Sequence, residues 1–228
     1  MAVKKRDNIP PPPKTTTGKK AATTRPPKAP KTRAATAVPA KDFKIEEWSN
    51  ETSGIKILLH ADSGMGKTTL VTMAPKPAFI GTDDGGREIR NPKTGKKLKH
   101  IPGVDTFLDV RSALQASIYD DYESVVIDTV TILEEWAEQH VLDTITNDSG
   151  ETMSSIVKYG WSNGYKHLYD MMKLILQDCD ALIRKGKNVI LIAQSTPHNV
   201  PNPGGEDFIR QGPRLVSRKN ANVEALYC

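Results

Sequence analysis

A glycine-rich stretch that follows an apolar run constrains the fold of this chain more than any other feature. The stretch reads Ala61-Asp-Ser-Gly-Met-Gly-Lys-Thr-Thr69, and the apolar run before it covers residues 55–60. It fits a pattern of one small residue, four variable positions and Gly-Lys-Ser/Thr, with Ala61 where glycine is commoner. A buried strand, this loop and a helix, in that order, form a phosphate-binding P-loop. The sequence therefore predicts an α/β protein that binds nucleotides.

The residue types of the loop suit phosphate binding. Gly64 and Gly66 let the backbone curl so that successive N–H groups point inward, and the positive end of the next helix adds to this cradle. Lys67 brings a mobile charge to the phosphates, and Thr68 brings a hydroxyl to a phosphate-bound Mg²⁺. The predicted nucleotide-binding residues are Asp62, Ser63, Gly64, Met65, Gly66, Lys67, Thr68 and Thr69. The expected ligands are ATP and Mg²⁺, and the alternative is a glycine-rich turn with an incidental lysine.

The rest of the chain supports an α/β fold. From about Phe43, short apolar runs alternate with longer amphipathic stretches, which favours a mainly parallel sheet. Strands are expected over residues 55–60, 78–80, 124–128 and 189–194, and helices from near Gly66, over about 131–142 and over 165–184. The spacing of Pro and Gly predicts an exposed loop or hairpin over 91–97 and a loop over 197–212. The sequence stops at 222–228, where the fold would be expected to continue into another core strand, so a short variant or a truncated reading frame is expected.

The first 42 residues differ in composition from the remainder. They hold half of the 16 prolines and eleven Lys or Arg against two Asp, so their net charge is +9, while the other 186 residues carry −4. Such a segment cannot bury enough apolar surface to offset its ordering entropy. We predict a disordered basic tail over 1–42 and one P-loop domain over 43–228. The tail is either an arm that meets nucleic-acid phosphates or a solvated extension.

No feature of the sequence indicates a membrane or an oxidising compartment. The longest strong apolar run, residues 189–193, is far shorter than the eighteen or so residues that cross a bilayer. No hydrophobic segment follows the charged first residues, so a secretory signal is not expected. The two cysteines, Cys179 and Cys228, do not have metal-ligand spacing. We therefore expect a cytoplasmic protein without a membrane partner.

A second acidic position follows the third apolar run. Ser124-Val-Val-Ile-Asp128 resembles a Walker B strand, in which buried residues carry one aspartate to the edge of the sheet where ligands gather. Asp128 and Thr68 are the predicted metal ligands, holding Mg²⁺ directly or through water. The alternative is that Asp128 caps the helix that follows it.

Hydrolysis also requires a group that orients or deprotonates water, and no Glu follows Asp128. Asp83 and Asp84 end the second predicted strand, and we favour Asp83; the alternative is that this pair caps the next turn. Gln194 ends the fourth strand, where it could sense the γ-phosphate, or it could be a glutamine held by backbone partners. The predicted catalytic residues are Lys67, Asp83 and Gln194.

These motifs together point to a known family. The segments ADSGMGKTT, FIGTDDGG, SVVIDTVT, GKNVILIAQS and GGEDFIRQGPRL resemble phage-encoded RecA-like P-loop ATPases, which include single-strand annealing ATPases, over about residues 53–219. The resemblance implies a RecA-like core that hydrolyses ATP and acts in recombination, annealing or replication of phage DNA in the bacterial cytoplasm. The family commonly has Glu where this chain has Asp83, and a shorter side chain would lie farther from the water. Many members have His at the position of Gln194.

The same resemblance places the loop 195–214 near the path of DNA. It implies DNA-phosphate or inter-subunit contacts by Arg210, Arg214, Arg218 and Lys219. Single-stranded DNA is the expected partner, with a single-strand binding protein and a second copy of the chain as further candidates. Lys93, Lys96, Lys97 and Lys99 form a second candidate surface. Because aromatic residues make up only 6% of the chain, DNA binding is expected to be mainly electrostatic.

Two other functions are compatible with the P-loop. A nucleotide or small-molecule kinase would need an Arg-rich lid and an acceptor pocket, and no lid segment is evident in the sequence. A nucleotide-binding assembly protein that hydrolyses poorly is the second alternative, and Asp83 in place of Glu is the reason to consider it.

Overall fold

The computed structural model describes residues 53–147 and 149–228 of the chain. The predicted disordered tail, residues 1–42, and the boundary at Phe43 lie outside the described residues.

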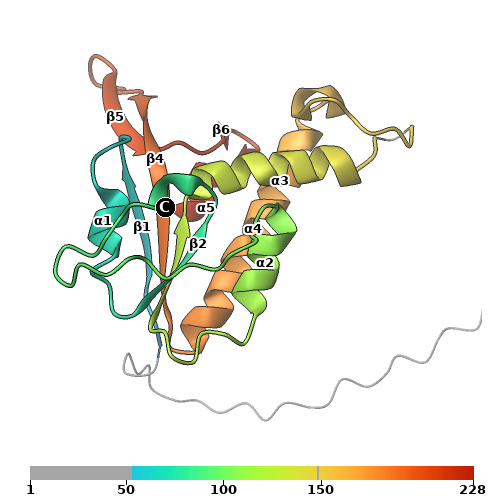
Figure 1. Ribbon diagram of the computed structural model, residues 1–228. Helices are drawn as coiled ribbons and strands as arrows, with labels where there is room; N and C mark the ends of the chain where they lie inside the picture. Colours follow the sequence, from blue (N-terminus) through green and yellow to red (C-terminus); the bar gives the residue numbers. More distant parts are fainter. Residues whose placement is uncertain (1–52, 148) are drawn as a thin grey trace, which may run out of the picture. The chain divides into compact units, whose positions relative to one another are not determined.

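A mainly parallel sheet forms the centre of the fold (Figure 1). Its strands are β1 (Lys56–Ala61), β2 (Pro77–Gly81), β3 (Ser124–Asp128) and β4 (Asn188–Val200), in the spatial order β1-β4-β3-β2. All three neighbouring pairs of these strands are parallel, so their carboxyl ends lie at one edge of the sheet. The predicted α/β fold is therefore confirmed.

Helices cover the two faces of the sheet unequally. On one face, α2 (Phe107–Gln115), α3 (Val130–Thr144) and α4 (Asn163–Arg184) pack together, whereas α1 (Lys67–Val71) lies on the other (Figure 1). The remaining elements are short: the 3-10 helices η1 (Asp84–Gly86) and η2 (Ile156–Tyr159), the strand pair β6 (Ser217–Arg218) and β7 (Ala221–Asn222), and α5 (Val223–Tyr227).

Alternation along the central strands explains why both faces are buried. Val125 and Ile127 belong to the larger core with the three long helices, and Val126 between them belongs to the smaller core beneath α1. Successive side chains of a strand point to opposite faces, so a strand covered on both sides is apolar throughout. This accounts for the uninterrupted apolar sequence of β3, whose five residues are all buried.

One expectation from the sequence needs correction, and two helices were not expected. Residues 197–212 are not a loop, because β4 continues to Val200 and pairs antiparallel with β5 (Phe208–Pro213) in a long hairpin. Residues 223–227 form the short helix α5, which the sequence did not indicate. Helix α2 was not expected. It begins with a capping box in which the Asp109 N–H donates to the Thr106 hydroxyl at 3.2 Å and the Asp109 carboxylate accepts from the Thr106 N–H at 2.9 Å.

Among the described residues, no helix combines the length and the apolar character that crossing a bilayer requires. Cys179 is buried in the larger core, and burial raises the pKa of its thiol to about 12. This thiol therefore behaves as a packing residue rather than as a nucleophile.

Candidate nucleotide-binding site

The glycine-rich loop joins β1 to α1, as expected for a phosphate-binding loop. Gly64 has φ of 79° and Gly66, the N-cap of α1, has φ of 77°. Side chains at such angles are strained, which explains glycine at both positions. A Cβ at either position would have no atom within 4 Å, so the surface of the loop is open. The loop therefore leaves room for an anion in front of its backbone.

The Lys67 ammonium group lies back over the loop. It donates hydrogen bonds to the carbonyl oxygen of Ala61 at 2.8 Å and to that of Asp62 at 2.9 Å. An ammonium group has three donors, so one remains for an incoming phosphate after these two bonds. Lys67 is half-buried, and the carbonyl contacts hold its charge at the loop. The side chain is thus positioned close to where the phosphates are expected.

Thr68 and Asp128 meet although 60 residues separate them in the chain. The Thr68 hydroxyl donates to Oδ2 of Asp128 at 2.7 Å. Asp128 ends β3 and is only 8% exposed. Burial raises the pKa of its carboxyl group and the charge of Asp83 adds to this, while the Thr68 hydrogen bond and the charge of Lys67 oppose it. Helix α1 therefore brings the two predicted metal ligands together.

This pair of residues suits Mg²⁺. Hydroxyl and carboxylate oxygens are the hard ligands that Mg²⁺ binds together with phosphate oxygens and water. A divalent cation would also compensate the negative charge that Asp128 holds in a buried position. The residues present thus fit a magnesium ion that Thr68 and Asp128 share.

Asp83 faces the same region but is engaged locally. Its Oδ1 accepts a hydrogen bond from the Gly85 N–H at 2.9 Å, so it caps η1, which was the alternative to a catalytic role. Asp83 and Asp128 both line a cavity of about 660 Å³. Asp84 also lines this cavity, but its exposed carboxylate pairs with Arg87 at 2.7 Å. Of the two predicted candidates, Asp83 is the one whose charge adds to the raised pKa of Asp128.

Comparison with known proteins identifies the family to which this arrangement belongs. Residues 53–226, well over half of the chain, match the family described as AAA domain. The chain belongs to the AAA domain family. An AAA-type ATPase domain that binds nucleotide is thereby supported, and the coarser part of the resemblance seen in the sequence is confirmed.

Curated sequences and solved structures add little to the family assignment of this AAA domain. No curated protein sequence matches it. Among solved structures, the flagellar accessory protein FlaH from Methanocaldococcus jannaschii is similar at 11% sequence identity with a TM-score of 0.30, and the match covers 70% of this chain and 78% of that chain.

Gln194 lies beside the P-loop of the AAA domain, since it pairs in register with Ala61 on the neighbouring strand. Its N–H donates to the Thr131 hydroxyl at 3.0 Å, and its carbonyl accepts from the Arg214 N–H at 2.7 Å. Its side-chain amide makes no hydrogen bond within residues 53–147 and 149–228. The backbone of Gln194 is therefore fixed while its amide group is available to a ligand.

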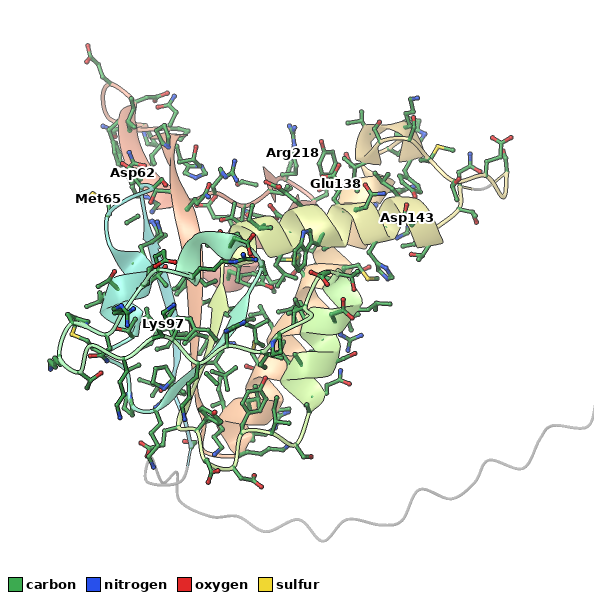
Figure 2. All side chains as sticks on the ribbon, in the orientation of Figure 1. Asp62, Met65, Lys97, Glu138, Asp143 and Arg218 are labelled. Carbon is green, nitrogen blue, oxygen red and sulfur yellow. The ribbon has the colours of Figure 1, made fainter. Side chains whose placement is uncertain are left out.

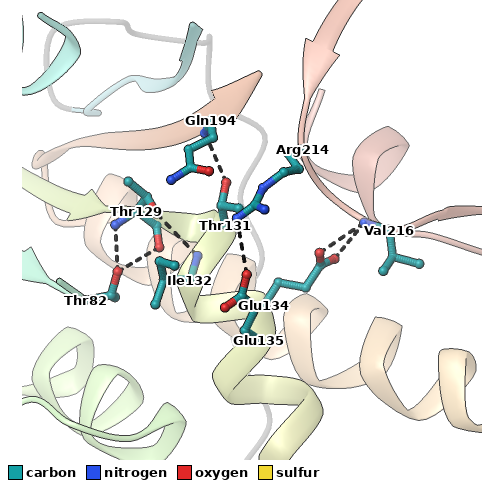
Figure 3. Close-up of polar contacts among 9 residues, drawn as sticks. All are labelled: Thr82, Thr129, Thr131, Ile132, Glu134, Glu135, Gln194, Arg214 and Val216. Atoms are coloured by element: carbon teal, nitrogen blue, oxygen red, sulfur yellow. Dashed lines mark hydrogen bonds and ion pairs between the residues drawn. The ribbon is translucent and has the colours of Figure 1, made fainter. Parts of the chain in front are cut away.

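Helix α3 follows β3 and contacts the segment after the hairpin through Glu134 and Glu135 (Figure 3). Thr129, not Asp128, is the N-cap of α3, because its hydroxyl accepts from the Ile132 N–H at 3.3 Å. Further along α3, the Val216 N–H donates to both carboxylate oxygens of Glu134, at 2.9 and 3.1 Å. Asp128 is therefore not the N-cap of α3, and the alternative role predicted for it is wrong.

Glu134 is a buried carboxyl group that the motifs did not reveal. Burial is the main reason that its pKa is raised to about 7, and the nearby charges of Glu138 and Glu135 add to the effect. The Val216 N–H and the charge of Arg214 act in the opposite direction. Its position in the AAA domain depends on a contact across 82 residues, so no local sequence pattern marks it.

The basic residues predicted to contact DNA or a neighbouring subunit lie on several elements. Arg210 lies 3.9 Å from the carboxylate of Glu224, and Arg214 lies 3.2 Å from that of Glu135. Arg218 stacks over the ring of Tyr165 at 5.2 Å. Lys219 is exposed. Three of the four cations in the AAA domain are therefore already matched by groups of the same chain.

Proposed function

We propose that this AAA domain hydrolyses ATP with Mg²⁺ and that single-stranded DNA stimulates the reaction, in recombination, annealing or replication of phage DNA in the bacterial cytoplasm. The observation that supports it best is the assembly of Lys67, Thr68 and Asp128 at one edge of the sheet. The Lys67 ammonium lies 2.8 Å from the Ala61 carbonyl, and the Thr68 hydroxyl lies 2.7 Å from Asp128.

Each residue of the site would have a separate role in phosphoryl transfer. The N–H groups of the loop and the Lys67 ammonium would bind the phosphates, and Thr68 with Asp128 would hold the metal. Bound Mg²⁺ neutralises the charge that develops on the phosphate oxygens. Asp83 would accept the proton of the attacking water on Oδ2, while its Oδ1 keeps the hydrogen bond from the Gly85 N–H. Gln194 would orient the water or sense the γ-phosphate from the point along β4 where its parallel pairing with β1 ends.

A steady-state assay of phosphate release, with and without oligo(dT), tests this function. We expect turnover in the wild-type chain, an increase with oligo(dT), and loss of turnover in Lys67→Ala. Lys173→Ala serves as the matched control, because Lys173 is an exposed lysine on α4. Turnover that is equal in Lys67→Ala and wild type would refute hydrolysis at this site. A turnover rate that is the same with and without oligo(dT) would refute only the link to DNA.

One observation favours a second function, an assembly protein that binds ATP and hydrolyses it poorly. The Asp83 carboxylate is already engaged as the cap of η1, and it is shorter than the Glu that the resembled family commonly has. Under this alternative, wild-type turnover equals that of Lys67→Ala while ATP binding persists in the wild type alone.

A further inference from the structure

The segment Arg87–Lys99, here called the lysine segment, carries concentrated positive charge in a domain that is otherwise mildly acidic. It contains six Lys or Arg and one acidic residue, Glu88. Arg87 pairs with Asp84. Within the described part of the chain, the other five basic residues form no ion pair with a carboxylate: Arg90, Lys93, Lys96, Lys97 and Lys99. All five are exposed.

We propose that the lysine segment binds the phosphate backbone of single-stranded nucleic acid, and that Asn91 couples this binding to the P-loop helix. The inference rests on the proposed function and assigns its partner surface. It differs from the expectation based on resemblance, because Arg210 and Arg214 each lie beside a carboxylate of their own chain. In the lysine segment, Lys99 lies over the Tyr122 ring at 5.3 Å, but the other four unpaired cations make neither an ion pair nor a cation–π contact within the described residues.

Asn91 organises the lysine segment and attaches it to α1. Its Oδ1 accepts hydrogen bonds from the N–H groups of Lys93 and Thr94 at 2.9 and 3.0 Å. Its Nδ2 donates to the Thr72 carbonyl at 2.7 Å. Thr72 is the C-cap residue of α1, and its N–H bonds back to the Thr68 carbonyl at 3.0 Å. A movement of the lysine segment on binding a strand would therefore be transmitted to α1, the helix that carries the predicted magnesium ligand Thr68.

The other end of the lysine segment runs beside β2 and borders a cavity that Asp83 and Asp128 line. The Phe79 N–H donates to the Lys99 carbonyl at 2.9 Å, which fixes the segment along the outer edge of β2. Lys97, labelled in Figure 2, lines the cavity of about 660 Å³ that Asp83 and Asp128 also line. The lysine segment thus contacts α1 through Asn91 and borders, through Lys97, the cavity that Asp83 and Asp128 line.

The surface chemistry favours nucleic acid over an anionic membrane. None of the large apolar side chains that are exposed in the described residues lies in the lysine segment. Leu98, its half-buried leucine, packs against the smaller core. Surface-bound membrane segments insert apolar side chains beside their cations, whereas contact with a phosphate backbone needs only the charges.

The first test is the salt dependence of binding, measured by anisotropy of labelled oligo(dT) with the full chain. Each phosphate contact contributes about 0.7 to the slope of log K against log salt for single strands. Combining Lys93→Ala, Lys96→Ala and Lys97→Ala should therefore lower the slope by about 2. The matched control combines Lys158→Ala, Lys166→Ala and Lys173→Ala, which remove the same charge from exposed positions in η2 and α4, and it should leave the slope unchanged.

Equal slopes for the two triple variants would overturn the inference while leaving the proposed function intact. Wild-type protein that does not bind oligo(dT) would refute the DNA part of the proposed function itself. Lysine-dependent binding to phosphatidylglycerol vesicles without binding to oligo(dT) would assign the surface to a membrane and also overturn the inference.

The second test addresses coupling through Asn91→Asp. This variant keeps the oxygen acceptor for Lys93 and Thr94 but loses the donor to the Thr72 carbonyl. At saturating oligo(dT), we expect the stimulation of ATP turnover to fall towards one while oligo(dT) still binds. Full stimulation in this variant would refute the coupling.

Discussion

Replacing Glu134 by glutamine should change how the stability of the domain depends on pH. The folded pKa of Glu134 is raised from 4.5 to about 7, mainly by burial. Between these two values the folded state retains a proton that the unfolded state has released. The free energy of unfolding of the wild type therefore falls as pH rises through this window, and levels off above the folded pKa.

The size of the effect follows from the shift in pKa. Each pKa unit corresponds to about 1.36 kcal/mol, so ionised Glu134 costs up to about 3 kcal/mol of stability above pH 7. A glutamine side chain at this position would be neutral in both states and would still offer a carbonyl oxygen to the Val216 N–H. We expect Glu134→Gln to match the wild type near pH 4.5 and to exceed it by up to about 3 kcal/mol at pH 8.

Urea denaturation at several pH values between 4.5 and 8 measures this difference directly. Subtracting one curve from the other removes the titration of all groups that both proteins share. Glu151→Gln, a change at an exposed position, is the matched control and should run parallel to the wild type. A Glu134→Gln curve that also runs parallel, or a difference that shrinks as pH rises, would refute the reasoning.

Three further substitutions test other parts of the structure. Leu133→Ala, at a side chain with 0% exposure, should cost about 2–5 kcal/mol in chemical denaturation, whereas Leu108→Ala, at 50% exposure, should cost far less. Gly66→Ala should lose about 1–2 kcal/mol and weaken ATP binding because φ is 77°, whereas Gly204→Ala, where φ is not positive, should do neither. Asp83→Asn should lower kcat by about 100-fold, with Asp84→Asn as its control; equal rates would exclude Asp83 as the base.

The central strands could be predicted because burial on both faces leaves a continuous apolar run. Residues 124–128 illustrate this, since every residue of β3 is buried. The hairpin could not be predicted in the same way. Its residues lie beyond the core, so pairing between His198 and Arg210 depends on backbone hydrogen bonds rather than on an apolar pattern. The capping box at Thr106 was a local signal for α2 that the apolar pattern did not emphasise.

The phosphate loop could likewise be recognised locally, because its chemistry resides in nine consecutive residues. The contact of Thr68 with Asp128 spans 60 residues, and that of Arg214 with Glu135 spans 79. Such contacts arise from the strand order and helix packing. The motif identifies the residues that could bind phosphate. The strand order and helix packing determine which distant residues contact them.

The most direct test of the central claim is calorimetric titration of the full chain with a non-hydrolysable ATP analogue in magnesium buffer. The account predicts saturable binding at one site, its loss in Lys67→Ala, and its retention in Lys173→Ala. Absence of binding in the wild type, or equal binding by Lys67→Ala, would contradict it.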